Sequence, residues 1–115
     1  MALKRGSIVL VPFLFTDLSN YKIRPSLILN PIDKEDFLIF FISSNITEKI
    51  NPTDFKITKD MEIFKETGLK YDSLVKCNKM TTIAKKIIFG ELGELPMDIM
   101  KTEINERLKI ALSIT

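Results

Sequence analysis

The fold class is clearest in residues 4–29, KRGSIVLVPFLFTDLSNYKIRPSLIL, where two strand patterns flank a polar loop. Ile8 to Phe13 is a continuous apolar run rich in β-branched residues, and it follows Gly6, which predicts a buried strand. The polar stretch Thr16 to Lys22 predicts a loop, and Ser26 to Leu29 predicts the next strand. The first quarter of the chain is therefore expected to form strands.

Strand patterns continue through most of the remaining chain, separated by turn-forming residues. Phe37 to Ser43 predicts a strand that pairs with Ser26 to Leu29 as an antiparallel hairpin. Met61 to Leu69 fits neither a strand nor a helix period, which predicts a loop or a single helical turn. Further strands are predicted at Phe55–Ile57, Leu74–Met80 and Ile87–Leu92.

The C-terminal part has a different period, which predicts a helix. Pro96 suits the first helical position, and Asp98 lies in the first turn, where its charge complements the helix dipole. The predicted helix is amphipathic and about 17 residues long, with apolar residues at Met100, Ile104, Leu108, Ala111 and Leu112. The expected fold is mainly β (α+β): a small SH3-like barrel or strongly bent antiparallel sheet of about five to seven strands, with the C-terminal helix on one side.

The composition indicates a single compact domain over residues 1–115. Hydrophobic residues make up 45% and charged residues 28% of the chain, as in ordinary soluble domains. The single cysteine, Cys77, cannot form an internal disulfide, and no basic-then-apolar leader opens the chain, so we expect a cytoplasmic protein. The longest apolar run, Phe37 to Ile42, is far shorter than the roughly 20 residues that cross a bilayer, so no membrane association is expected.

The sequence contains no histidine, which excludes Ser-His-Asp triads and zinc sites with imidazole ligands. One cysteine also excludes thiolate metal clusters. Metal sites built on imidazole or on several thiolates are therefore excluded, and no cofactor is expected.

The net charge of +2 conceals an uneven distribution of charge along the chain. Residues 1–30 and 61–90 each carry +3, whereas residues 31–60 and 91–115 each carry −2, as counted from the sequence. If the two basic segments meet in the fold, they form a face that attracts phosphate. The alternative is an evenly mixed surface charge.

Arg24 precedes Pro25 at the start of a predicted strand, and proline holds the residue before it extended. A guanidinium fixed there suits a phosphate, because its planar fork pairs with two oxygens. The alternative is an ordinary surface arginine.

The order of motifs, KRGSIVLVPFLFTD…KIRPSLILN…FFISSNI…GLKYDSLVKCNKMTTI…GELGELP, resembles the MazF/PemK toxins of bacterial toxin-antitoxin modules over nearly the whole chain. The resemblance implies the MazF/PemK/CcdB-like fold. It also implies a sequence-specific, metal-independent endoribonuclease, an RNA interferase that cuts single-stranded RNA. Such an enzyme uses the substrate's own 2′-hydroxyl as nucleophile and leaves a 2′,3′-cyclic phosphate and a 5′-hydroxyl.

The resemblance also assigns roles to residues. Arg24 falls where the family stabilises the scissile phosphate, and Ser43 falls where the family has its catalytic Thr or Ser. From local chemistry alone, Ser43 is equally a polar strand end satisfied by the backbone. The residues expected to contact RNA are Asp17, Tyr21, Lys22, Ser44, Lys76, Asn78 and Lys79.

Two departures from the family pattern bear on activity. The PemK branch places an Arg and an Asp two residues apart where this chain has Lys76 and Asn78, and asparagine cannot act as a base. Ser7 stands where the family usually has an acidic residue after the glycine. Strict alternation in the strand predicted there places Lys76 and Asn78 on one face, and Cys77 and Lys79 on the other.

The partners that the resemblance implies are single-stranded RNA, a cognate antitoxin with a disordered acidic tail, and a second copy of the chain in a homodimer. Contact with DNA is expected only indirectly, through the antitoxin. Two alternatives remain open at this point: a toxin on the same fold that poisons gyrase without cutting RNA, and a catalytically inactive member that still binds RNA or antitoxin.

Overall fold

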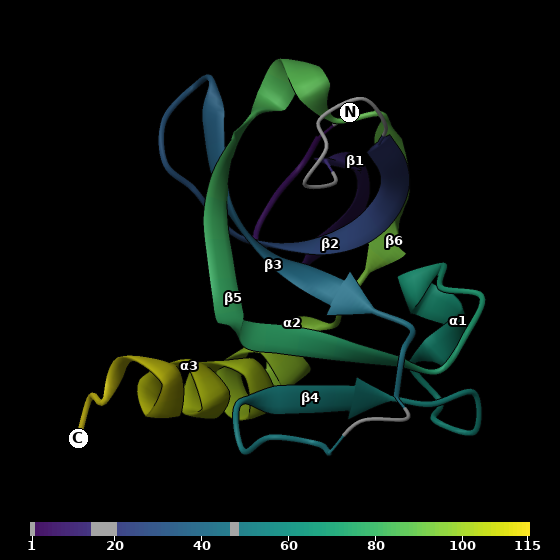
Figure 1. Ribbon diagram of the computed structural model, residues 1–115, viewed down its shortest axis with the longest axis vertical. Helices are drawn as coiled ribbons and strands as arrows, with labels where there is room; N and C mark the ends of the chain where they lie inside the picture. Colours follow the sequence, from purple (N-terminus) through teal and green to yellow (C-terminus); the bar gives the residue numbers. More distant parts are fainter. Residues whose placement is uncertain (1, 15–20, 47–48) are drawn as a thin grey trace.

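The protein is described by a computed structural model that covers residues 2–14, 21–46 and 49–115. These residues form one curled antiparallel sheet of six strands in the order β4-β5-β3-β2-β1-β6, shown in Figure 1. The strands are β1 (Ser7–Leu14), β2 (Tyr21–Pro31), β3 (Asp36–Ser43), β4 (Asp54–Ile57), β5 (Ser73–Ala84) and β6 (Gly90–Glu94). The expected fold class, a strongly bent antiparallel sheet with a C-terminal helix, is confirmed.

Short helices connect and complete the sheet. The helical segments are α1 (Phe64–Thr67), the 3-10 turn η1 (Lys85–Ile87), α2 (Met97–Ile99), the π-helical η2 (Met100–Ile104) and α3 (Asn105–Leu112). The last three follow one another directly after Pro96, so they form the predicted C-terminal helix. It lies against the lower half of the sheet, near β4 and β5, in Figure 1.

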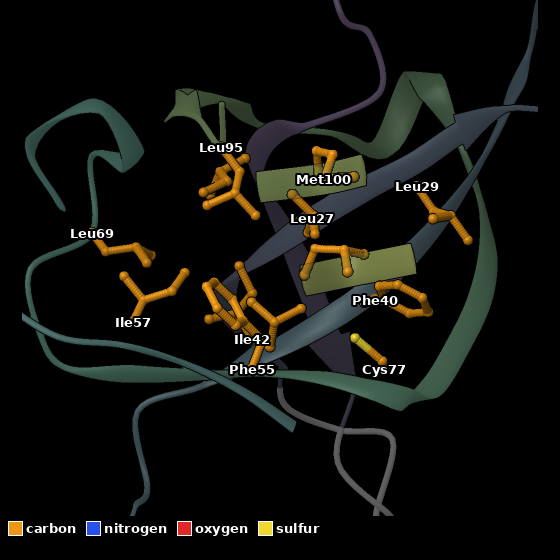
Figure 2. Close-up of a cluster of buried hydrophobic side chains, with 13 residues drawn as sticks. Leu27, Leu29, Phe40, Ile42, Phe55, Ile57, Leu69, Cys77, Leu95 and Met100 are labelled. Carbon is orange, nitrogen blue, oxygen red and sulfur yellow. The ribbon is translucent and has the colours of Figure 1, made fainter. Parts of the chain in front are cut away.

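The main hydrophobic core lies between the curled sheet and the C-terminal helix, as Figure 2 shows. Leu27 and Phe40 of the sheet and Met100 of the helix are fully buried. Each such side chain contributes about 1.5–3 kcal/mol by leaving water. A smaller cluster lies on the opposite face of the sheet and contains Val9, Val11, Ile28, Phe37, Ile39 and Ile88.

The predicted apolar stripe of the helix is correct only for its first part. Met100 and Ile104 are fully buried, and Leu108 packs against the core. Leu112 is 49% exposed, contrary to the prediction. Leu112 is the last residue of α3, so the buried stripe does not continue to the end of the helix.

Two strands, β2 and β6, begin at other residues than predicted. β2 begins at Tyr21, so Arg24 lies inside a strand and pairs with Val11 of β1, rather than following a loop. The last predicted strand begins later than expected, at Gly90, because Lys85–Ile87 forms η1. No helix in the part of the chain that the structure describes is long and apolar enough to span a membrane.

A bulge in β5 overturns the strict alternation expected around Cys77. Phe40 of β3 pairs with Met80, but its neighbour Phe41 pairs with Lys76, so three residues of β5 have no opposite partner. A bulge of this kind bends the strand and changes the direction of its side chains. Lys79 therefore lines the same groove as Lys76, instead of following Cys77 to the other face.

Candidate functional site

The sheet opens where β2 and β3 stop pairing. Their ladder ends at the pair Ser26–Phe41. On either side the neighbouring ladders continue: β1 stays paired with β2 to Tyr21, and β3 stays paired with β5 to Ser43. The start of β2 and the end of β3 are thus each held by an outer strand but not by each other. Arg24 lies on one side of this opening and Ser43 on the other.

A groove of about 320 Å³ occupies the opening. We call it the Arg24 groove; it is lined by Phe13, Arg24, Phe41, Ile42, Ser43, Asn45, Leu74, Lys76 and Lys79. Its lining includes three basic side chains and, among the described residues, no carboxylate. Basic groups around a concave surface focus a positive potential that attracts anions.

Arg24 is held by an aromatic ring, and no carboxylate among the described residues pairs with it. Its guanidinium lies 5.7 Å from the centroid of the Phe13 ring, which packs edge-on against Phe41 at 5.1 Å between centroids. Its Nε is buried, and among the described residues it has no hydrogen-bond partner. A buried polar atom without a partner is costly, and an anion bound in the groove would satisfy it.

The Ser43 hydroxyl is oriented by a turn at the end of β3. Its Oγ accepts a hydrogen bond of 3.1 Å from the backbone N–H of Asn45. Accepting this bond leaves the hydroxyl proton available for donation. Ser43 can therefore donate a hydrogen bond to an oxygen atom bound in the groove.

Lys76 is anchored by a buried carboxylate, Asp54, that no sequence pattern marks. Its Nζ lies 3.0 Å from Oδ2 of Asp54, the residue paired with it across the β4–β5 ladder. The Asp54 side chain is 0% exposed and also accepts a 2.9 Å hydrogen bond from the Asn51 N–H. Asp54 reaches Lys76 because the register of β4 against β5 pairs these two residues. The sequence of a strand as short as β4 does not predict that register.

The C-terminal helix reaches the same region through Arg107. The Nε of Arg107 donates to the Asp54 carbonyl at 2.8 Å, and its guanidinium lies 5.1 Å from the Phe55 ring centroid. Its Nη1 pairs with Glu103 at 2.7 Å. β4 is thus fixed to both β5 and the helix, which makes the Asp54 carboxylate a rigid support for Lys76.

Cys77 lies beside this cluster and is fully buried. Burial raises the pKa of its thiol to about 12, an effect that the positive charge of Arg107 partly offsets. The thiol is therefore protonated at neutral pH and is not a nucleophile. Among the residues that the structure describes, no group of three or more His, Cys, Asp or Glu side chains is arranged to hold a metal ion.

A neighbouring groove of about 410 Å³ lies on the other side of Arg24. We call it the Tyr71 groove; it is lined by Leu10, Lys22, Ile23, Arg24, Pro25, Ile42, Ser44, Gly68, Leu69, Lys70, Tyr71, Ser73 and Leu92. It shares Arg24 and Ile42 with the Arg24 groove, so the two are adjacent.

The expected site residues divide between these two grooves. The structure brings Arg24, Ser43, Lys76 and Lys79 together in the Arg24 groove, and places Lys22 and Ser44 in the Tyr71 groove. Asn78 is exposed and lines neither groove. Tyr21 is the first residue of β2, and Asp17 lies outside the described residues.

Ser7 has a local structural role at the position where an acidic residue was expected. Its side chain is buried, and its Oγ accepts a 3.0 Å hydrogen bond from the Lys4 N–H. The Ser7 N–H in turn donates to the Lys4 carbonyl at 2.9 Å. The hydroxyl closes this turn at the start of β1 and lines neither groove.

Comparison with known proteins identifies the family. The family model of the PemK-like, MazF-like toxins of type II toxin-antitoxin systems matches residues 4–112. The chain belongs to this toxin family. The resemblance seen in the ordered motifs is thus confirmed. No curated protein matches the sequence significantly.

Solved structures share the fold of this PemK-like, MazF-like toxin at low sequence identity. A mycobacterial endoribonuclease bound to its cognate antitoxin superposes with a TM-score of 0.74 at 20% identity, over 99% of this chain and 98% of that one. A MazE-MazF structure from Deinococcus radiodurans gives 0.75 at 16% identity, over 100% and 99%. The Mycobacterium tuberculosis toxin MazF-mt6 gives 0.68 at 18% identity, over 93% and 98%.

Proposed function

We propose that this toxin is a metal-independent endoribonuclease that cleaves single-stranded RNA at a phosphate bound in the Arg24 groove. The observation that carries the proposal is the Arg24 guanidinium, which lacks an acidic partner among the described residues and faces Ser43 across the opening of the sheet. The name of one structural relative, an endoribonuclease, supports the same activity.

The proposed reaction is an internal transfer of the phosphate. The 2′-oxygen of the RNA attacks phosphorus as it loses its proton, and the bond from phosphorus to the 5′-oxygen breaks as that oxygen gains a proton. The products are a 2′,3′-cyclic phosphate and a 5′-hydroxyl. No protein nucleophile is required, since the attacking oxygen belongs to the substrate, and in this proposal Arg24 supplies the positive charge at the phosphate.

Each residue of the groove has a distinct role in this proposal. Arg24 stabilises the negative charge that develops on the phosphate oxygens, an interaction typically worth about 2.7–4 kcal/mol for one preorganised donor. Ser43 donates a hydrogen bond to the same phosphate. Lys79 neutralises part of the charge of the RNA backbone, and Lys76, whose charge Asp54 balances, donates a hydrogen bond from its ammonium group to a phosphate oxygen.

We further propose that the toxin acts in the cytoplasm as a homodimer and is inhibited by a cognate antitoxin. Structures of relatives containing MazE with MazF, or a cognate antitoxin, support such a partner. The acidic tail expected for it complements the basic grooves. DNA would be contacted only through the antitoxin.

The test is incubation of the purified toxin with mixed-sequence single-stranded RNA in EDTA, followed by mass analysis of the product ends. We expect fragments that end in a cyclic phosphate, made equally well with EDTA or Mg²⁺. Cleavage that requires Mg²⁺ would refute metal independence. RNA left intact under both conditions would overturn the proposal and favour an inactive member or a gyrase-type toxin.

The Lys34→Ala variant is a suitable control, because Lys34 is exposed in the turn between β2 and β3 and lines neither groove. It should cleave at the wild-type rate.

A further inference from the structure

We propose that the Tyr71 groove binds a nucleotide next to the cleaved phosphate, with the base stacked on Tyr71 and a phosphate paired with Lys70. This inference rests on the proposed function. It adds a base-binding subsite built from the segment between α1 and β5. None of the site residues expected from the sequence lies in that segment.

The two grooves are adjacent through shared residues, so one RNA strand can occupy both. Arg24 and Ile42 line both grooves, and Ser43 and Ser44 are consecutive residues that line one each. A phosphate held at Arg24 therefore has a neighbouring nucleotide within reach of the Tyr71 groove.

Tyr71 has the exposure that a stacking platform needs. Tyr71 is 63% exposed, so a large part of its surface is open to a base. The Nζ of Lys59 lies 5.9 Å from the ring centroid, so positive charge accompanies the exposed ring. Proteins that bind single strands combine exposed aromatic rings with basic groups in this way.

The backbone around Tyr71 is fixed by hydrogen bonds. The Ser73 hydroxyl donates to the Tyr71 carbonyl at 2.7 Å, and the Lys59 N–H donates to Asp72 Oδ1 at 2.8 Å. Gly68, with φ of +71°, lets the chain pass so close to β6 that a Cβ there would lie 2.2 Å from the Leu92 carbonyl oxygen. The ring is thus presented on a preorganised segment, which reduces the entropy lost on binding.

The lining of the groove matches a nucleotide in both its apolar and its charged parts. Leu10, Leu69 and Leu92 provide apolar surface for a flat base. Lys22, Arg24 and Lys70 provide positive charge, and no Asp or Glu of the described chain lines the groove. An exposed aromatic ring beside basic groups is the combination that binds single-stranded nucleic acid, so RNA is the occupant that we propose.

Binding is best measured with a 2′-deoxy single-stranded oligonucleotide, because it lacks the attacking hydroxyl and cannot be cleaved by the proposed reaction. Fluorescence anisotropy with a labelled oligonucleotide gives Kd for each variant. We expect Tyr71→Ala to weaken binding about 5-fold or more, as for the loss of one stacked base. Tyr71→Phe should stay close to wild type, since the ring is retained. Lys70→Gln should weaken binding and reduce its salt dependence, whereas Lys34→Gln should not.

Shortening the oligonucleotide one nucleotide at a time from each end locates the subsite. The effect of Tyr71→Ala should vanish when the nucleotide that stacks on the ring is removed. Equal affinity of wild type and Tyr71→Ala for every length would overturn the inference and assign the groove to another occupant, such as an antitoxin peptide. Wild-type protein that neither binds this oligonucleotide nor cuts RNA would instead overturn the proposed function, and this inference with it.

Discussion

The Nζ of Lys76 lies 3.0 Å from Oδ2 of Asp54, directly across the β4–β5 ladder. The Asp54 side chain is fully buried, whereas the Lys76 side chain is 13% exposed and lines the Arg24 groove. The pair therefore connects the hydrophobic core to the surface where we place the RNA. It fixes the position of one positive charge next to Arg24.

Breaking this pair should destabilise the protein. Lys76→Met leaves the buried Asp54 carboxylate without its cation, which we expect to lower the free energy of unfolding by about 3–5 kcal/mol in urea titrations. The double variant Asp54→Asn/Lys76→Met removes both charges and should recover at least half of that loss. Additive losses in the double variant would show that the two residues contribute independently.

The raised pKa of Cys77 predicts a stability that falls at high pH. A thiol with a pKa of about 12 in the folded protein and 9.0 when unfolded holds its proton more tightly in the folded state. Its contribution is thus fully present below pH 9 and is lost as the pH rises from 9 towards 12. Urea unfolding at several pH values should show a steeper fall for wild type than for Cys77→Ala. If the free energy of unfolding fell equally with pH for the two proteins, the raised pKa of Cys77 would be contradicted.

The same burial predicts that the Cys77 thiol is unreactive in the folded protein. Because the thiol is buried and protonated, a thiol-specific reagent at pH 7.5 should modify the native protein far more slowly than the urea-unfolded protein. Equal rates in the two states would mean that the thiol is accessible in the folded toxin.

Gly68 is predicted to tolerate no side chain. Its φ of +71° disfavours any L-residue, and a Cβ would lie 2.2 Å from the Leu92 carbonyl oxygen. Gly68→Ala should lower the free energy of unfolding by more than about 1 kcal/mol. It should also weaken RNA binding, because α1 and the segment before Tyr71 must move. A wild-type thermal midpoint for this variant would show that α1 moves away from β6 without cost.

Much of the fold follows from local sequence patterns, because the strands are apolar runs bounded by turn residues. Ile8–Phe13 and Phe37–Ser43 lie inside β1 and β3. The C-terminal helix begins at Met97, one residue later than predicted, because Pro96 has extended backbone and is its N-cap rather than its first helical residue. Leu112 departs from its predicted burial: it is the last residue of α3 and is 49% exposed, because the extent of the core that covers the helix depends on tertiary packing rather than on local pattern.

The candidate site is harder to predict from the sequence, because its residues come from different strands that only the tertiary structure brings together. Arg24 and Ser43 were assigned from the family resemblance, and the structure places both at the same opening of the sheet. Asp54 and Tyr71 lie in a short strand and a connecting segment whose positions depend on tertiary contacts. No local pattern marks either residue.

The central claim is that the Arg24 guanidinium acts on the scissile phosphate, and the most direct test compares cleavage of one defined RNA by wild type, Arg24→Lys and Arg24→Ala. We predict that Arg24→Ala unfolds at a thermal midpoint near that of wild type but cleaves about 10²–10³-fold more slowly, as for the loss of one charge-stabilising donor. Arg24→Lys should retain part of the rate, because it keeps the charge without the planar fork. Wild-type cleavage by folded Arg24→Ala protein would contradict the account.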